Sequence, residues 1–459
     1  MKEKTFYLES LGCAKNSVDS RSMAQLLVKQ GFDEVDRAGA AEVLVVNTCG
    51  FIRSAREESL KEVRRLFSQK RKGQKIVVAG CLVDRDKQLV ESLAGVDGIL
   101  GARDWPSIGQ LVDYLRRDAP GVPYAIPQSS TIREPGGVTR FALEGPSAYL
   151  KIADGCRRAC AYCSIPLIKG GLVSRPAREI VDEAVLLQEK GVKEIILIAQ
   201  DTTDYGHDLG LKDGLADLIG QIQAAAPRIP WVRVLYAYPG YVTDRLIDAL
   251  SAEGQLLPYL DMPLQHADEQ VLRDMRRPAN MEWVLRTVEK LRRNVPGLAL
   301  RTTFIVGYPT EDEAAFRRLL DFVAEVRFDR VGTFRFSFEP GTASEVLGDP
   351  VPEELKEERE GRLMELQASI SLARNQEFVG QTLDVLIEGT DGKLSVGRSY
   401  RDAPEIDGLV LVEGEAPVGE IVPVEITAAT TYDLVGHAAK DQARDARRVL
   451  NPEALGLGG

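Results

Sequence analysis

The stretch SAYLKIADGCRRACAYCSIPL, residues 147–167, decides the fold of this chain. Its first seven residues form a short, largely apolar run that is typical of a buried strand. Cys156, Cys160 and Cys163 follow in the spacing C-x3-C-x2-C, and we call them the loop trio. Thiolates are soft ligands that select zinc, copper(I) or iron–sulfur clusters. Three thiols spaced this closely therefore predict that they bind one metal ion or metal cluster together at the end of a strand.

Further strand patterns follow the loop trio. They alternate with helical patterns such as AREIVDEAVLLQEKG and lie at 147–153, 194–199, 232–237, 258–263, 299–306 and 331–337. Six consecutive strand–helix units predict a partial (β/α)6 barrel. Chemistry is expected at the carboxyl ends of the barrel strands, which is where the loop trio lies.

The N-terminal part of the chain has the same alternation on a smaller scale. Short apolar runs at 5–10, 41–47, 75–80 and 96–100 are separated by amphipathic segments, which predicts a doubly wound parallel sheet. Cys13, Cys49 and Cys81, which we call the N-terminal trio, each follow the end of such a run. Parallel strands share one carboxyl edge, so these three cysteines are predicted to converge there.

The remaining segments complete an α/β architecture. About five short strands in 380–437, after a helical pattern at 352–378, predict a small antiparallel β-barrel of OB-like size. Residues 118–146 lose periodicity and gain Pro and Gly, which predicts a linker. The final 19 residues, DQARDARRVLNPEALGLGG, are expected to be loosely ordered. The expected boundaries are 4–117 for the N-terminal domain, 118–141 for the linker, 142–377 for the core and 378–446 for the C-terminal barrel.

Composition narrows the class of protein. The chain has 459 residues, 44% hydrophobic and 28% charged, with a net charge of −11. An acidic chain is a poor general binder of nucleic-acid backbones. The start of the chain lacks the apolar stretch of a signal peptide, and no run approaches the roughly 20 apolar residues of a membrane span. Six cysteines are too few for a disulfide scaffold, so a cytoplasmic location is expected.

The ligand set of each trio favours iron–sulfur chemistry. Zinc sites usually close with four ligands, whereas each trio has three cysteines and no histidine nearby. Three thiolates suit a 4Fe-4S cluster with one iron open to a small molecule such as S-adenosylmethionine. Zinc sites and inert buried thiols remain as alternatives at this point. A cluster protein that senses redox state without catalysis is a further alternative. Such a protein would not cleave S-adenosylmethionine, so formation of 5′-deoxyadenosine from S-adenosylmethionine would exclude it.

The loop trio motif resembles that of the radical S-adenosylmethionine superfamily. SLGCAKNSVDS, VNTCGFI and AGCLVDR, around the N-terminal trio, resemble the methylthiotransferase family within it, and so do LIAQDTTDYG, PYLDMPLQHA, LRTTFIVGYPTE and FSFEPGTA. The C-terminal barrel resembles a TRAM domain. The resemblance implies two 4Fe-4S clusters, one on Cys156, Cys160 and Cys163 and an auxiliary one on Cys13, Cys49 and Cys81, with S-adenosylmethionine as cofactor.

The resemblance also implies a mechanism. One S-adenosylmethionine methylates a sulfur at the open iron of the auxiliary cluster, and a second is cleaved reductively to give a 5′-deoxyadenosyl radical that removes hydrogen from the substrate. An electron donor such as flavodoxin or ferredoxin is implied. Tyr162 is expected to pack the adenine, and Gln200 and Arg301 are candidate cofactor contacts for which a structural role is equally open. Gln200 and Asp201 stand where related enzymes often carry a glycine-rich strand ending in Glu.

The family divides by substrate, which is either a tRNA adenosine or an aspartate of ribosomal protein S12. Residues 380–436 hold eleven acidic and three basic residues, a balance that would repel tRNA and attract a basic protein. GRSYRDAPEIDG, residues 397–408, also resembles the ribosomal-protein branch. We expect ribosomal protein S12 as substrate, with the tRNA adenosine enzyme as the alternative. Reversal of Asp402, Glu405 and Asp407 to Lys is expected to impair methylthiolation of the ribosomal protein and to spare radical generation without substrate.

Overall fold

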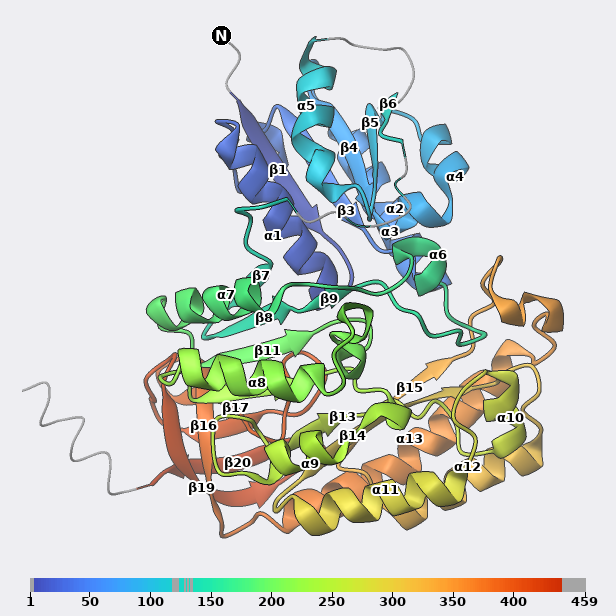
Figure 1. Ribbon diagram of the computed structural model, residues 1–459, viewed down its shortest axis with the longest axis vertical. Coiled ribbons are helices and arrows are strands. Elements are labelled where there is room, and N and C mark those ends of the chain that lie inside the picture. The colour runs from blue at the N-terminus through green and yellow to red at the C-terminus, as the bar shows by residue number, and fades with distance from the viewer. Residues whose placement is uncertain (1–3, 118–123, 128, 130–131, 133–134, 440–459) are drawn as a thin grey trace, which may run out of the picture.

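The computed structural model describes residues 4–117, 124–127, 129, 132 and 135–439. Figure 1 shows the N-terminal α/β unit above the central barrel, and the C-terminal strands against the lower part of the barrel. The C-terminal tail that the sequence predicts to be loosely ordered lies outside the described residues, as does part of the predicted linker. Within the described ranges, no helix combines the length and the apolar character needed to cross a bilayer.

The N-terminal unit is a parallel sheet with helices on both faces, as predicted. Its strand order is β2-β1-β3-β4-β5-β6, with bounds Asp33–Glu34, Thr5–Ser10, Val43–Thr48, Lys75–Gly80, Gly98–Gly101 and Tyr124–Ala125. Alternate residues of β3 face opposite sides: Val43 and Val45 pack under α1 (Ala14–Lys29) and α5 (Ile108–Arg117). Leu44 and Val46 pack on the other face, which is covered by α2 (Arg53–Ser68), α3 (Cys81–Arg85) and α4 (Lys87–Ser92). Continuous apolar strands are typical of a sheet buried on both faces.

The core is a partial barrel of six parallel strands, which confirms the predicted (β/α)6 arrangement. They form the sheets β8-β11-β12 and β13-β14-β15, with bounds Ser147–Lys151, Glu194–Ile198, Trp231–Val234, Tyr259–Asp261, Ala299–Val306 and Arg330–Arg335. A parallel bridge between Val232 and Leu256 joins the two sheets. The outer helices are α7 (Ala177–Glu189), α8 (Gly214–Ala225), α9 (Asp244–Ser251), α10 (Glu269–Asp274), α11 (Met281–Asn294) and α12 (Glu313–Val326).

Two short strands occupy the region that the sequence predicts to be a linker. β6 extends the N-terminal sheet, and β7 (Phe141–Glu144) pairs antiparallel with β8. The sequence pattern did not predict these two strands, because strands of two and four residues flanked by Gly and Pro are too short to show a period. Short elements after β8 are β9 (Ala153–Asp154), α6 (Ile165–Lys169) and β10 (Val173–Ser174). The 3-10 helices are Ala38–Ala40, Trp105–Ser107, Thr202–Asp204, His207–Leu209, Pro239–Tyr241 and Ala343–Leu347.

The C-terminal domain is the predicted small closed barrel. The long helix α13 (Glu353–Gln376) leads into it, and its strands close in the order β16-β17-β18-β20-β19, with bounds Thr382–Thr390, Leu394–Ser399, Val410–Glu413, Leu434–Ala438 and Ile421–Ala429. Four of the strand pairs are antiparallel, whereas β18 and β20 pair in parallel. The barrel is thus not wholly antiparallel, since β19 lies between β18 and β20 in the chain but not in the sheet.

The other two domains pack against opposite ends of the central barrel. Inward-facing Tyr149, Ile196 and Tyr259 form one apolar cluster with Val18 of α1 and with Ala403 of the C-terminal domain. The alternate residues of the same strands face outward and pack under the helices. The N-terminal helix α1 therefore covers the carboxyl end of the barrel, and the C-terminal domain covers its amino end.

Candidate functional site

The N-terminal trio lies along the carboxyl edge of the first sheet. Cys13 immediately precedes α1, Cys49 follows β3, and Cys81 is the first residue of α3. Gly12 packs closely against Cys49: a Cβ on Gly12, whose φ is +94°, would lie 2.8 Å from the Cys49 Cβ. Only glycine fits this position. The loop after β1 is thus held against the loop after β3, as the parallel topology predicts.

Asn16 ties these loops together, and the sequence reasoning missed it. Its Nδ2 donates hydrogen bonds to the Leu11 carbonyl at 2.7 Å and to the Thr48 carbonyl at 3.1 Å. The Cys81 Sγ lies 3.8 Å from Asn16 Oδ1. One side chain therefore contacts the segments that carry all three cysteines. The available signal was its place one turn after Cys13 in SLGCAKNSVDS, at the start of a helix.

Burial disfavours the free thiolates of Cys49 and Cys81. It raises the pKa of Cys81 well above that of an exposed thiol. Burial also raises the pKa of Cys49, although the N–H groups of Phe51 and Gly50 donate to its sulfur and oppose the shift. A metal ligand must be deprotonated, so a bound cation would supply the stabilisation that water cannot.

The loop trio is held in a tight turn after β8 and β9. The Arg158 N–H donates to Cys156 Sγ at 3.4 Å, and the Cys163 N–H donates to the Cys160 carbonyl at 3.1 Å. Gly155 makes the turn possible, because a Cβ there would lie 1.9 Å from the Gly171 carbonyl oxygen. Burial raises the pKa of Cys156 to about 11 and that of Cys163 to about 12.

Arginine side chains and tyrosine rings surround the loop trio. Arg158 donates to Asp201 at 2.8 Å, and its guanidinium carbon lies 3.7 Å from the centre of the Tyr241 ring. Arg277, which the sequence reasoning also missed, donates to Cys160 Sγ at 3.8 Å and lies 4.2 Å above the Tyr238 ring. The positive charge of Arg158 and Arg277 beside the sulfur atoms opposes the effect of burial on the pKa of Cys156 and Cys163.

The donor set of both trios fits an iron–sulfur cluster. All six cysteines are free thiols, and five of them are partly or wholly shielded from water. Among the described residues, no three His, Cys, Asp or Glu side chains are grouped to hold a single metal ion. A 4Fe-4S cluster places each thiolate on a different iron atom, so its ligands lie further apart than those of one ion.

The three predicted cofactor contacts lie in different places. Tyr162 lines a cavity of about 170 Å³ together with Phe51 and Ile305, and burial raises its pKa well above that of a free tyrosine. Gln200 is half-buried, two residues after the end of β11. Arg301 lies near the amino end of β14, where its Nη1 donates to Asp261 at 2.9 Å. The guanidinium of Arg301 is therefore already paired, and its contact with a cofactor stays a prediction.

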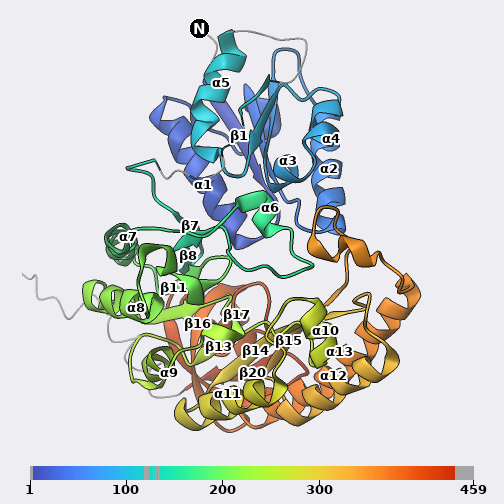
Figure 2. The same ribbon diagram turned by 45° about the vertical axis from the view of Figure 1, so that its right-hand side comes forward.

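The loops of the two trios touch each other. Ser164, which follows Cys163, donates from Oγ to the Phe51 carbonyl at 3.2 Å, two residues after Cys49. Arg85 Nη2 donates to the Pro340 carbonyl at 2.9 Å across the same boundary. Figure 2 shows α6, which continues from the loop trio, between the N-terminal sheet and the barrel. The loops that carry the two trios, at the ends of two different sheets, thus lie against each other.

A buried ionic network fixes this relative position. Asp19 of α1 accepts hydrogen bonds from Arg140 at 2.8 Å and from Lys151 and Lys169 at 2.7 Å each. Asp154 of the barrel pairs with Lys151 at 2.6 Å. Breaking a buried network by removing one partner is costly, because it leaves an uncompensated charge. The network therefore makes the N-terminal domain and the barrel one unit.

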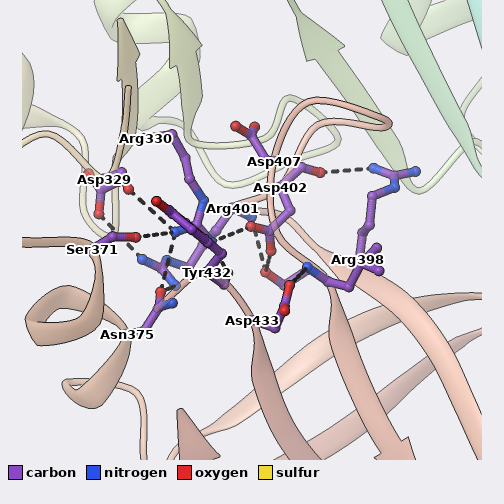
Figure 3. A network of polar contacts seen from close by, with 12 residues as sticks. Asp329, Arg330, Ser371, Asn375, Arg398, Arg401, Asp402, Asp407, Tyr432 and Asp433 are labelled. Atoms are coloured by element: carbon purple, nitrogen blue, oxygen red, sulfur yellow. Dashed lines mark hydrogen bonds and ion pairs between the residues drawn. The ribbon is translucent and has the colours of Figure 1, made fainter. Parts of the chain in front are cut away.

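A second buried network joins the C-terminal domain to the amino end of the barrel (Figure 3). Arg398 Nη2 pairs with Glu194 of β11 at 2.6 Å, and Arg330 of β15 pairs with Asp402 at 2.6 Å. Asp407 accepts a hydrogen bond from the Tyr259 hydroxyl at 2.6 Å. Asp407 also lies 3.3 Å from Arg301 Nε, although this contact lacks the geometry of a hydrogen bond.

These contacts correct the expectation for residues 397–408. Asp402 is 1% exposed, as is the side chain of Asp407, so neither forms part of a free surface. The expectation that they lie on an accessible face for a basic protein is wrong, whereas Glu405 is exposed as expected. A count of charges along the chain cannot separate solvated carboxylates from buried ion pairs.

The outer face of the C-terminal barrel nevertheless remains acidic. Lys393 is its one exposed basic residue within 380–436, because Arg398 and Arg401 are buried. The exposed acidic residues number seven: Asp384, Asp391, Glu405, Glu413, Glu415, Glu420 and Glu425. We call these seven residues the acidic face.

Comparison with known proteins covers nearly the whole chain. Residues 5–101 match the Uncharacterized protein family UPF0004, residues 150–323 the Radical SAM superfamily, and residues 379–438 the TRAM domain. The Ribosomal protein uS12 methylthiotransferase RimO of Roseiflexus sp. (strain RS-1) is 46% identical over 466 residues, covering 96% of this chain and 98% of its own. The protein of the same name from Chloroflexus aurantiacus is 46% identical over 453 residues, with 94% and 99% covered.

Solved structures support the fold at low sequence identity. The radical S-adenosylmethionine methyltransferase TsrM from Kitasatospora setae, solved with cobalamin and a [4Fe-4S] cluster, aligns with a TM-score of 0.53 at 14% identity, covering 85% of this chain and 81% of its own. The cobalamin-dependent radical enzyme OxsB aligns with a TM-score of 0.51 at 12% identity, covering 78% and 56%. Both likenesses concern the arrangement of elements alone.

Proposed function

This chain belongs to the ribosomal protein uS12 methylthiotransferase family of radical S-adenosylmethionine enzymes, and we propose that it transfers a methylthio group to the β-carbon of an aspartate in ribosomal protein S12 (uS12). Each turnover would consume two molecules of S-adenosylmethionine, one as methyl donor and one as radical source. An unactivated C–H bond is too weakly acidic for any side-chain base, which is why radical chemistry is required.

We assign the two cofactor sites to the two trios. The loop trio would hold the 4Fe-4S cluster that supplies an electron for cleavage of S-adenosylmethionine, and the N-terminal trio would hold the auxiliary cluster that supplies the sulfur. The backbone N–H of Arg158 and the guanidinium of Arg277 donate to the sulfurs of the loop trio and favour their charged form. Tyr162, in its cavity beside Phe51, would pack the adenine, and Gln200 is the second candidate contact to the cofactor.

The hydrogen bond between Ser164 and Phe51 carries the proposal. It joins the residue after Cys163 to a carbonyl two positions after Cys49, so the loops that we assign to the radical source and to the sulfur source lie in contact. A transfer in which one site removes hydrogen and the other donates sulfur requires this proximity, since the substrate carbon must reach both. The buried Asp19 network keeps the two sites in register without a bound substrate.

The charge of the C-terminal barrel supports a basic protein as the substrate. The acidic face of the C-terminal barrel would attract a Lys- and Arg-rich ribosomal protein and repel the backbone of tRNA. A cytoplasmic location follows from a ribosomal substrate, and a small electron carrier such as flavodoxin or ferredoxin would serve the loop trio. We further propose domain boundaries at 4–117, 142–377 and 378–446, with 118–141 as the connection.

Mass spectrometry of ribosomal proteins from cells lacking the gene tests this function. We expect one aspartate of uS12 to lose its added methylthio mass, and the purified enzyme with dithionite and S-adenosylmethionine to restore it. Nucleoside analysis of tRNA from the same cells tests the alternative substrate. Loss of a methylthio adenosine from tRNA together with unchanged uS12 would overturn the assignment.

A further inference from the structure

Lys15, in the first turn of α1, is a buried lysine whose Nζ has no ion pair or hydrogen bond among the described residues. Lys15 is 8% exposed, and its Nζ lies 3.3 Å from the centre of the Tyr236 ring. No carboxylate of the described chain lies within ion-pair distance of this Nζ, and no hydrogen-bond acceptor contacts it. An aromatic face attracts a cation but does not satisfy its three N–H donors. Asp261 and Asp154 attract this charge from a greater distance, but neither contacts it. The N–H donors of Lys15 are therefore open to an anion from outside the fold.

The other buried lysines show how this fold normally treats such a charge. Lys151 and Lys169 each lie 2.7 Å from Asp19, and Lys356 lies 2.7 Å from Asp349. Each of these three ammonium groups has a carboxylate supplied by the chain itself. Lys15 differs from them because the fold buries it and leaves its donors open.

The position of Lys15 identifies the anion it would meet. It lies two residues after Cys13, and Tyr236, over which it stands, lies just beyond the end of β12 at the mouth of the barrel. The backbone of Tyr236 is in the left-handed region, with φ +64°, and its N–H donates to Asp261 Oδ2 at 3.2 Å. That conformation is unusual for an aromatic residue and fixes the ring under Lys15. The ammonium therefore stands between the N-terminal trio and the barrel lumen.

We propose that Lys15 binds the carboxylate of the substrate aspartate and so selects an acidic side chain; this rests on the function proposed above. In aspartate the carboxylate carbon is bonded directly to the β-carbon. A carboxylate held by Lys15 thus brings the β-carbon beside Cys13, where the sulfur would be delivered. An adenosine offers no carboxylate, so the same contact disfavours the tRNA substrate. S-adenosylmethionine also carries a carboxylate, on its methionyl group, that Lys15 could bind. The experiment below distinguishes this carboxylate from that of the substrate aspartate.

Peptide binding to the anaerobic enzyme holding both clusters tests the proposal. Two synthetic peptides of the modified uS12 loop, one with Asp and one with Asn at the target position, are titrated into wild type, Lys15→Met and Lys15→Gln. A charge-assisted hydrogen bond predicts that wild type prefers the Asp peptide by about 10- to 100-fold. Both Lys15 variants should bind the two peptides within about twofold. Lys61→Met, which removes an exposed charge from α2, is the matched control and should keep the preference.

The remaining outcomes decide against the proposal in distinct ways. An Asp preference retained in both Lys15 variants overturns it. If the Lys15 variants bind S-adenosylmethionine about tenfold more weakly in the absence of peptide and keep the Asp preference, Lys15 contacts the cofactor carboxylate instead. Loss of half the iron in both variants assigns Lys15 to the auxiliary cluster. A wild type that neither binds nor modifies either peptide contradicts the proposed function itself, and this inference with it.

Discussion

Replacing Glu194 by Gln should loosen the C-terminal domain from the barrel. Burial opposes ionisation of Glu194, but Arg233 and Arg398 outweigh it and lower its pKa from 4.5 to about 2. With about 1.36 kcal/mol per pKa unit, this shift corresponds to roughly 3 kcal/mol of stability at neutral pH. We therefore expect Glu194→Gln to lower the free energy of unfolding by about that amount at pH 7.5. Urea denaturation followed by tryptophan fluorescence measures it, since Trp231 lies at this junction.

The pH dependence and a matched variant make the test specific. Because the pKa of Glu194 is lower in the folded state, its stabilisation is complete above about pH 5 and is lost as the pH falls towards 2. The difference between wild type and Glu194→Gln should shrink accordingly below pH 4.5. Glu420 pairs with Lys193 at 2.7 Å across the same junction, but its side chain is 57% exposed, so Glu420→Gln should cost under about 1 kcal/mol. Equal effects of the two substitutions would refute the reasoning.

Two further changes test the cluster sites and the corrected surface. Replacing the loop trio by Ala should remove half of roughly eight irons and abolish 5′-deoxyadenosine formation. Replacing the N-terminal trio by Ala should remove the other half and leave some cleavage of S-adenosylmethionine. Iron analysis and chromatography measure the two effects, and full retention of iron would contradict the ligand assignment. Asp402→Asn should lower the free energy of unfolding by about 3–5 kcal/mol, because Arg330 then lies buried without its partner. If the urea midpoint is unchanged and uS12 binds more weakly, Asp402 belongs to a binding surface and the correction made above is wrong.

The sequence predicted the places of all six cysteines because they depend on local patterns. Strand ends follow from hydrophobic period, and parallel strands bring their carboxyl ends to one edge. Buried pairings between distant residues left no such signal. Arg398 and Glu194 are separated by 204 positions, and in the sequence each reads as an ordinary surface charge. In the sequence, Lys15 likewise resembles a solvated helix residue, whereas the fold places its Nζ over the Tyr236 ring at the mouth of the barrel.

The two ends of the barrel divide the proposed recognition of the substrate. The C-terminal domain packs on the amino end, whereas both trios lie at the carboxyl end. Glu405 is near enough to Tyr236 to affect its pKa, but the other six residues of the acidic face lie on the C-terminal barrel, away from the space where the sulfur would be delivered. Charges at that separation act by long-range attraction, which weakens as salt shortens the Debye length from about 10 Å at 0.1 M to about 3 Å at 1 M. Attraction of this kind raises the rate of encounter with a basic protein but cannot choose one side chain. That choice requires a desolvated contact at the carboxyl end, which is what Lys15 would provide.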